Sequence, residues 1–453
     1  MRSSNTSLDV GGSCRTRAWL VALVIALAAL ETADAIDPTR DVSQYMRDQW
    51  GTEQGFAGGP VHAIAQTTDG YLWIGTDAGL VRFDGVTFRP MQPQVAGLPA
   101  VRTVLGLATD SEGTLWLRMA GPMLLRYHGG VFTSATPDGA LPAALVTAMV
   151  RGRDGHLLLS SMGSGTIRER SGRFDLLAAP DALPRSVVIS IAETPAGDVW
   201  MGTRDAGVVS LRGRQTSVHA TGLPDRKVNT LLPGEHQELW IGTDKGVVRW
   251  NGREITSSGV PAALAGVQVL SMIRDRAANI WIGTASGDLL RVSANVVSPL
   301  GAAAGRPRGA VTALFEDRDG NLWVGSARGI ERVRDGAFVT YSTHQGLPSE
   351  TSGPIHVDLE RRTWFAPSDG GLYWLQGARL TPVAAAELAR DIVYSIAGTG
   401  RDVWIGRQRG GLTRLRESTA RGHRRPTQKC KGSRRTASTR CTRVVMARSG
   451  PAR

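Results

Sequence analysis

The sequence DGYLWIGTDAGLVRFDG at residues 69–85 holds two short apolar segments, each bounded by turn residues. Its Asp-Gly pairs tolerate the positive φ angles that tight turns require. With the flanking sequence, residues 61–66, 71–75, 80–84 and 86–90 form four consecutive strand patterns. We therefore predict a four-stranded antiparallel sheet in this part of the chain.

Copies of this segment recur along the chain and are marked by Trp residues. These are Trp73, Trp116, Trp200, Trp240, Trp281, Trp323, Trp364 and Trp404. Neighbouring Trp residues are 40 to 43 positions apart, except for one double gap between Trp116 and Trp200. The segment DGHLLLSSMGSGTI lies inside this gap, and we assign Leu159 to the position of its missing Trp. The chain therefore contains nine copies, one of which is degenerate.

A period of about 40 residues with strand patterns throughout predicts an all-β fold of the β-propeller class. Each copy supplies a four-stranded blade, and blades that pack face to face bury apolar surfaces that a lone sheet would expose. We interpret the Trp residues as structural anchors that fill the wedge between neighbouring blades. The nine copies allow one seven-bladed ring with two extra blades, or one larger ring. In the seventh copy, the repeat order assigns the fourth strand to residues 337–343 (AFVTYST).

The positive charge of the chain is concentrated at its C-terminus. The formal net charge is +13, and residues 417–453 contain 11 Lys and Arg residues but one acidic residue. Because the repeats are close to neutral, the usual inference from a basic protein to a nucleic-acid partner does not apply, and we expect no nucleic acid. Cys14, Cys430 and Cys441 lie outside the repeats, which therefore have neither disulfides nor a thiolate metal site. We expect no cofactor.

The N-terminus has the pattern of a secretory signal peptide. A basic region precedes the apolar residues 19–30 (WLVALVIALAAL), which are too few to span a membrane comfortably. Ala33 and Ala35 match the small-residue rule for cleavage, so we expect cleavage before Ile36. An uncleaved anchor is the alternative. Residues 1–35 are thus a predicted signal peptide, and the mature chain is expected to be periplasmic or secreted.

The repeat pattern stops after Arg416. Residues 417–453 lack strand alternation and turn spacing, which favours a disordered basic tail. A second hypothesis is a frameshift between Arg416 and Pro426. Allowed codons for the tail, read one base earlier, encode another blade-like segment whose Trp falls about 40 positions after Trp404, as the repeat period requires. On this hypothesis the tail has no evolved function.

Residues 49–85 resemble the first repeat of two-component regulator propellers, the periplasmic sensor regions of bacterial signalling proteins. The core LWIGTxxGL followed by R-F-D-G is the repeat motif of that family, and the resemblance covers about residues 41–416. In this family two seven-bladed propellers commonly follow each other. An immunoglobulin-like domain, a membrane helix and an output domain come next. The output is a histidine kinase, often hybrid, or a diguanylate cyclase.

The resemblance implies that residues 36–343 form a propeller of seven blades and that residues 344–416 begin a second, incomplete one. It implies a ligand-sensing part of a receptor, truncated before its membrane helix and output domain. The expected ligand is a small molecule or a carbohydrate, and the sequence does not identify the ligand-binding residues. The full-length form would be anchored in the inner membrane with a histidine kinase or diguanylate cyclase output, and it could form a dimer.

The repeats lack patterns typical of a catalytic or metal site. The His residues are His62, His128, His156, His219, His236, His344, His356 and His423. None forms a pair at metal-ligand spacing, and His344 and His356 fit a loop and a strand. Asp317, Asp319 and Asn321 resemble the start of a calcium loop, but the bidentate Glu is missing. The Gly-rich turns lack the Lys-Ser/Thr of a phosphate loop. We therefore expect no catalytic residue, no metal and no enzymatic activity.

Two other functions remain open at this point. A secreted propeller lyase acting on an antibiotic or a polysaccharide would need His and acidic side chains that converge at the mouth of the central channel. A stand-alone protein-interaction propeller would use the loops around the channel, as a sensor also does. The sequence alone does not separate the last function from a sensor.

Overall fold

The structure is a computed structural model. It describes residues 36–37, 40–95, 102–135, 145–301, 308–336, 341–343, 347, 351, 353–376, 379–383, 388, 391–399, 402–416 and 440–444. The chain divides into two compact units, residues 1–336 and residues 337–453. The described residues form nine four-stranded antiparallel sheets with a few short 3-10 helices, so the predicted all-β propeller fold is confirmed.

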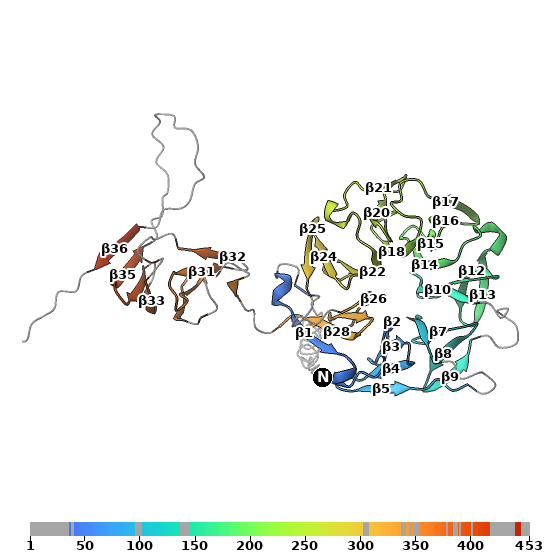
Figure 1. Ribbon diagram of the computed structural model, residues 1–453, viewed down its shortest axis with the longest axis horizontal. Coiled ribbons are helices and arrows are strands. Elements are labelled where there is room, and N and C mark those ends of the chain that lie inside the picture. The colour runs from blue at the N-terminus through green and yellow to red at the C-terminus, as the bar shows by residue number, and fades with distance from the viewer. Residues whose placement is uncertain are drawn as a thin grey trace, which may run out of the picture. The chain divides into compact units, whose positions relative to one another are not determined.

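Six sheets of the first unit are each built from four consecutive strands (Figure 1). Their strands are β2 (Val61–Gln66), β3 (Leu72–Thr76), β4 (Leu80–Phe83) and β5 (Phe88–Met91); β6 (Val104–Thr109), β7 (Leu115–Met119), β8 (Leu124–His128) and β9 (Val131–Ser134); β10 (Val146–Arg151), β11 (Leu157–Ser161), β12 (Gly165–Arg170) and β13 (Arg173–Ala178); β14 (Val188–Glu193), β15 (Val199–Thr203), β16 (Val208–Arg212) and β17 (Gln215–His219); β18 (Val228–Pro233), β19 (Leu239–Thr243), β20 (Gly246–Trp250) and β21 (Ile255–Thr256); and β22 (Val269–Arg274), β23 (Ile280–Thr284), β24 (Leu289–Ser293) and β25 (Val296–Leu300). The short 3-10 helices are η1 (Val42–Gln44), η2 (Thr52–Gln54), η4 (Pro180–Ala182) and η5 (Ala262–Leu264).

The seventh sheet is completed by a strand from the start of the repeat region. It has the order β1 (Met46–Trp50), β28 (Gly329–Arg334), β27 (Leu322–Ser326) and β26 (Val311–Glu316). The expectation that residues 337–343 supply the fourth strand is therefore wrong. Pairing with β1 satisfies the open hydrogen-bonding edge of β28 and ties the last blade to the segment that leads into the first.

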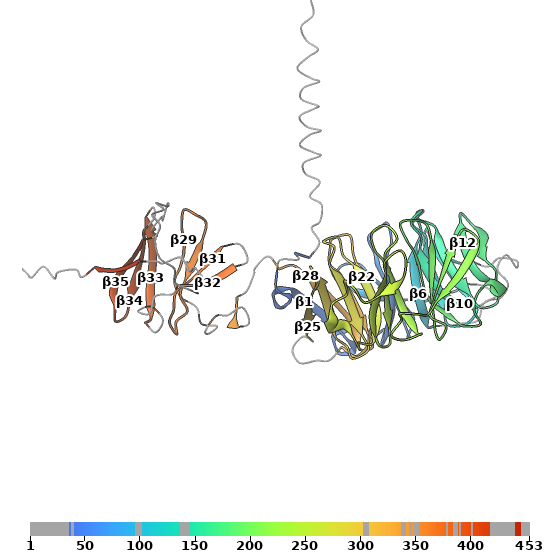
Figure 2. The ribbon, with the colours of Figure 1, turned by 90° about the horizontal axis from the view of Figure 1, so that it is seen from above.

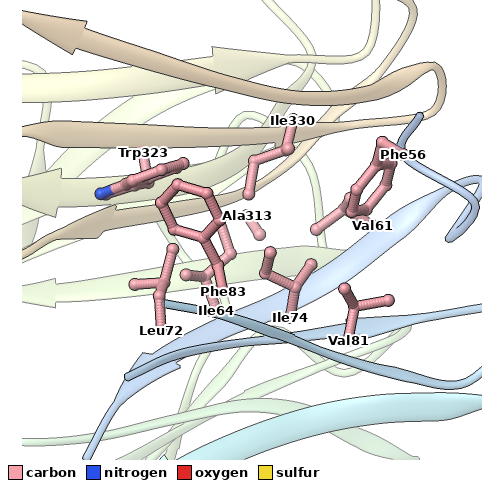
Figure 3. Close-up of a cluster of buried hydrophobic side chains, with 10 residues drawn as sticks. All are labelled: Phe56, Val61, Ile64, Leu72, Ile74, Val81, Phe83, Ala313, Trp323 and Ile330. Atoms are coloured by element: carbon pink, nitrogen blue, oxygen red, sulfur yellow. The ribbon is translucent and has the colours of Figure 1, made fainter. Parts of the chain in front are cut away.

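The ring of the first unit closes with seven blades. The innermost strands β2, β6, β10, β14, β18, β22 and β26 contact one another in this order, and β26 also contacts β2. Figure 2 shows these sheets side by side, viewed from above. The larger nine-bladed ring is therefore not formed. Where the last blade meets the first, Trp323 packs against Phe83 with ring centroids 5.4 Å apart, inside a cluster of buried apolar side chains (Figure 3).

The repeated Trp side chains are built into the blades by two kinds of contact. Seven of them are buried, and Trp404 is partly buried. The indole nitrogen of Trp323 donates a hydrogen bond of 2.7 Å to Asp317, six residues earlier, and Trp116 and Trp281 make the same bond to their own Asp. An Arg of the neighbouring strand lies over the ring, as Arg332 does over Trp323. In these blades the hydrogen bond to Asp satisfies the one polar atom of a large buried side chain, whereas the indole nitrogen of Trp200 has no such partner.

In the degenerate third blade, the predicted position of the missing Trp is wrong by one residue. Leu158 pairs with Val150 across the first two strands, as Trp73 pairs with Ala65 in the first blade. Leu158, and not Leu159, therefore occupies the Trp position. The repeat motif predicts this register when its Asp-Gly turn is aligned, because Leu158 follows Asp154 at the same distance as Trp73 follows Asp69.

The second unit contains two four-stranded sheets. Their strands are β29 (Ile355–Val357), β30 (Thr363–Phe365), β31 (Tyr373–Gln376) and β32 (Arg379–Pro382), and β33 (Val393–Thr399), β34 (Asp402–Arg407), β35 (Gly411–Arg416) and β36 (Arg440–Val444). Strand β36 lies in the segment expected to be a disordered tail, so that expectation does not hold for these five residues. Its backbone pairs with the open edge of β35, which would otherwise leave N–H and C=O groups without partners.

Candidate ligand site in the central channel

Every innermost strand of the seven-bladed ring carries a β-bulge at the same place. The pairing register shifts after the first residue, so the second residue has no Cα partner on the next strand. The bulged residues are His62, Leu105, Thr147, Ile189, Asn229, Leu270 and Thr312. A bulge re-aims its side chain, and four of these residues, His62, Leu105, Thr147 and Ile189, line one cavity among the innermost strands.

A cavity of about 240 Å³ lies among these strands. Its lining comes from five innermost strands, β2, β6, β10, β14 and β18, and from one residue of β7. The polar side chains in this lining belong to His62, Arg118, Thr147, Ser190 and Thr230. Arg118 is the only lining residue with a permanent charge, and no carboxylate is among the lining residues. The cavity is therefore a small polar site with positive charge.

In the other blades of the ring, the position equivalent to Arg118 holds a small residue. The equivalent residues are Gly75, Ser160, Gly202, Gly242, Gly283 and Gly325. The residue opposite Arg118 on the innermost strand is Gly106, whereas Ala63 lies opposite Gly75. A Cβ atom on Gly106 would lie 2.9 Å from Arg118 Nε, so the absence of a side chain at Gly106 leaves room for the guanidinium to extend toward the channel.

The Arg118 guanidinium has a neutral hydrogen-bond partner and no acidic one. Its Nη2 donates a bond of 2.8 Å to the Leu105 carbonyl oxygen. Other arginines of the ring pair with carboxylates, as Arg168 does with Glu193 at 2.8 Å, but no Asp or Glu in the described part of the chain forms an ion pair with Arg118. Burial lowers the pKa of Arg118, yet an arginine stays protonated in proteins. The charge in the channel is therefore not neutralised by the described residues around it.

A His–Asp pair also lies by the channel. His62 Nε2 is 2.7 Å from Asp77 Oδ1, and the Asp77 side chain is 55% exposed. His62 is the only His among the lining residues, and they include no Glu. The lyase hypothesis requires several such groups together at the channel mouth, and the cavity offers this one pair.

Several other polar side chains of the inner strands are used to link blades. Asn229 Nδ2 donates to Asp244 at 2.7 Å and to the Val269 carbonyl oxygen of the next blade at 2.8 Å. Ser190 Oγ donates to the Val228 carbonyl oxygen at 3.1 Å. These bonds hold neighbouring blades together, whereas the Arg118 guanidinium donates to the Leu105 carbonyl oxygen of its own blade.

The structure does not gather the remaining sequence-predicted residues at this cavity. His128, His219 and His356 lie on β8, β17 and β29, and His156 and His236 lie in turns. The signal-cleavage residues Ala33 and Ala35, and also His344 and His423, lie outside the described residues, whereas Ile36 is 2% exposed and packs against apolar side chains of the sixth and seventh blades.

The side chain of Asp317, in the segment that resembles the start of a calcium loop, has hydrogen-bond partners within its own blade. The Asp317 carboxylate accepts hydrogen bonds from Trp323 and from the backbone N–H groups of Asp319 and Asn321. Its oxygens are thus engaged within the turn of the repeat. The described residues contain no group of three or more His, Cys, Asp or Glu side chains placed to hold a metal ion.

Arg118 is the site residue that the sequence analysis missed. Its signal was present in the second copy, which reads LWLRM where the first reads LWIGT. A departure from a Gly position in one blade marks a side chain added to the channel, but the pattern alone also fits a degenerate copy.

Comparison with known families supports the repeat assignment. Residues 55–78 and 305–328 match the family model described as two component regulator propeller. No curated protein matches the chain.

Solved structures with the same fold include extracellular domains of B. thetaiotaomicron hybrid two component systems. One is 19% identical with a TM-score of 0.62, and the match covers 85% of this chain and 55% of that chain. A second is 18% identical with a TM-score of 0.52, and covers 82% of this chain and 52% of that chain. The chain thus spans about half the length of these structures. A streptogramin B lyase structure is 12% identical with a TM-score of 0.54, and covers 66% of this chain and 100% of that chain.

Proposed function

Since this chain belongs to the two-component regulator propeller family, we propose that its seven-bladed ring is the ligand-sensing part of a signalling receptor. The observation that carries this proposal is the cavity in the central channel, where Arg118 brings a charge that no described carboxylate neutralises. A ring built from packed blades is a rigid scaffold, so its channel is a preformed site for a small molecule or a carbohydrate.

The proposed location of the ring is the periplasm or the cell exterior. The fold is shared with extracellular domains of two component systems, and the N-terminal sequence has the pattern of a signal peptide. Ile36, the first residue after the expected cleavage site, is buried in the ring, so cleavage there would leave the folded part intact. Among the described residues, no helix is long and apolar enough to cross a membrane.

The proposed partner of the ring is an output domain in the full-length receptor. Family membership favours a membrane-anchored form with a histidine kinase or a diguanylate cyclase, in which ligand binding shifts the population of an active state. We propose that such a receptor acts as a dimer. On this view the ring binds its ligand without chemical change, in contrast to a lyase.

Ligand binding is tested by thermal unfolding of the purified chain against a set of sugars, sugar acids, amino acids and nucleotides. A ligand at 100 times its Kd adds about 2.7 kcal/mol to the free energy of unfolding, which raises Tm measurably. We expect at least one compound class to raise Tm in a saturable manner and to be recovered unchanged by mass spectrometry.

Two results would contradict the sensor proposal. Conversion of the bound compound to an eliminated product would favour a lyase. Stoichiometric capture of one periplasmic protein, together with no Tm change for any compound, would favour a stand-alone protein-interaction propeller.

A further inference from the structure

In one pair of facing residues, the larger residue lies on the innermost strand in the first blade and on the second strand in the second blade. In the first blade the innermost strand carries Ala63 and the second strand carries Gly75. In the second blade Gly106 is on the innermost strand and the larger residue, Arg118, is on the second. The Gly therefore lies where the long side chain must pass, since a Cβ atom there would come within 2.9 Å of Arg118 Nε and 3.3 Å of Arg118 Cβ. The guanidinium is accommodated by a matched change on the facing strand.

Keeping a guanidinium in this cavity has a cost that the fold does not offset with an acid. A charge taken out of water is normally paired, because desolvation disfavours the charged form. Arg118 donates its hydrogen bond to the neutral Leu105 carbonyl oxygen. No other residue that lines the cavity carries a permanent charge. Asp77 is not among the lining residues, and its carboxylate lies 2.7 Å from His62 Nε2. The remaining donors of the guanidinium are thus open to a ligand.

We propose that Arg118 binds the oxyanion group of a small acidic ligand in the central channel. The inference rests on the proposed sensing function and names the chemical class of its ligand. A planar guanidinium recognises a carboxylate or a phosphate through two parallel N–H···O bonds.

The neighbouring groups and the size of the cavity define the ligand further. The hydroxyl of Thr147 and the imidazole of His62 line the same cavity and can bond ligand hydroxyl groups. The volume of about 240 Å³ lies below the range of about 300–1,000 Å³ that holds drug-sized molecules. The site therefore suits a compact acid, such as a sugar acid or a sugar phosphate, or the acidic end of a longer glycan.

The test measures binding of defined probes to the full chain by isothermal titration calorimetry. The probes are glucuronate, glucose 6-phosphate, inorganic phosphate and sulfate, with glucose as the neutral counterpart. We expect at least one oxyanion probe to bind about ten-fold or more tightly than glucose, because a hydrogen bond to a charged group contributes about 1.5–3 kcal/mol. The phosphate and sulfate arms separate recognition of a bare oxyanion from recognition of a sugar that carries it.

Three variants assign the binding to the guanidinium. Arg118→Met keeps an unbranched apolar stem and removes the guanidinium, and we expect it to weaken oxyanion binding about ten-fold or more while binding of glucose is unchanged. The double variant Gly106→Ala/Arg118→Gly restores the residue pair of the first blade and should fold normally without oxyanion binding. The matched control is Arg126→Met in the same blade, which removes a guanidinium on β8 that bonds Thr133.

The outcomes separate this inference from the proposed function. Equal oxyanion affinity in the wild type and in either folded Arg118 variant would overturn the inference, as would wild-type binding of glucose with no binding of any oxyanion probe. In both cases a saturable Tm increase with a neutral compound would leave the sensing function standing. Loss of oxyanion binding in the Arg118 variants but not in Arg126→Met would support the inference.

Discussion

Arg47 on β1 and Glu331 on β28 form an ion pair between residues 284 positions apart in the chain. Glu331 is 2% exposed, and it also accepts a hydrogen bond of 2.6 Å from Arg308. A second pair with the same strands joins Asp48 to Arg332 at 2.7 Å. The strand that closes the ring is thus held by buried or half-buried charges as well as by backbone pairing, and charge complementarity favours this register over a shifted one.

Replacing Glu331 by Gln should destabilise the ring strongly. The substitution leaves the Arg308 and Arg47 guanidinium groups without a carboxylate, and breaking a buried pair costs about 3–5 kcal/mol. The midpoint of guanidinium chloride unfolding should fall accordingly. Arg89→Met is the control, because Arg89 is 65% exposed and its nearest carboxylate is 3.9 Å away, which predicts a change below about 1 kcal/mol. Similar losses in both variants would show that the buried pair has no special role.

Acidification should remove the contribution of Glu331. Burial raises the pKa of this carboxyl, but hydrogen bonds from Arg308 and Arg47 outweigh burial and lower it overall. The stabilisation is therefore fully present above the unfolded pKa of about 4.3 and is lost as the pH falls through the lowered folded pKa. The difference in Tm between the wild type and Glu331→Gln should shrink from pH 7 toward pH 3. A difference that grows on acidification would contradict the lowered pKa.

Removal of β1 should open the ring. A chain that begins at Gly51 exposes the edge of β28, which then pairs with other molecules, so size-exclusion chromatography should show aggregates. A peptide of residues 36–50 should restore a monomer by adding a strand to that edge. The same peptide with Arg47→Glu places like charges against Glu331 and should bind more weakly. A monomer with wild-type Tm in the absence of peptide would show that β1 is dispensable.

Asp317→Ala should destabilise the seventh blade because the indole nitrogen of Trp323 loses its acceptor. An unsatisfied buried donor costs about 1–3 kcal/mol, which denaturant unfolding resolves. The exposed Asp319 is the matched control, and Asp319→Ala should leave the free energy of unfolding nearly unchanged. Calcium or a chelator should not shift Tm, because the Asp317 oxygens are engaged by donors of the turn. A calcium-dependent rise in Tm would revive the metal hypothesis.

The predicted fold depended on short-range features that the structure retains. The Asp-Gly turns, the strand alternation and the spacing of the Trp residues are local, and six of the seven blades in the ring are formed by four consecutive strands. Those features therefore predicted an all-β propeller and the positions of its buried aromatic side chains. The Trp position of the third blade was misplaced by one residue because no Trp marks it, although the Asp-Gly turn at Asp154 indicates Leu158, and one residue in a strand changes the face of the sheet.

The closing strand and the candidate site depend on long-range contacts. Nothing in the local pattern of residues 46–50 predicts that they pair with β28, because the partner strand lies almost the whole length of the ring away. The assignment of Arg118 to the candidate ligand site likewise depends on Gly106, which lies opposite it, and on the absence of an acidic residue from the described lining of the cavity.

By itself the sequence determined the repeat, the blade and the turn chemistry, because these arise from residues close together in the chain. The tertiary structure decided the number of blades in the ring, the strand that closes it and the charge left in its channel. The physical reason is that ring closure and desolvation of a guanidinium are properties of residues brought together by folding, and their energies depend on partners that sequence spacing does not reveal.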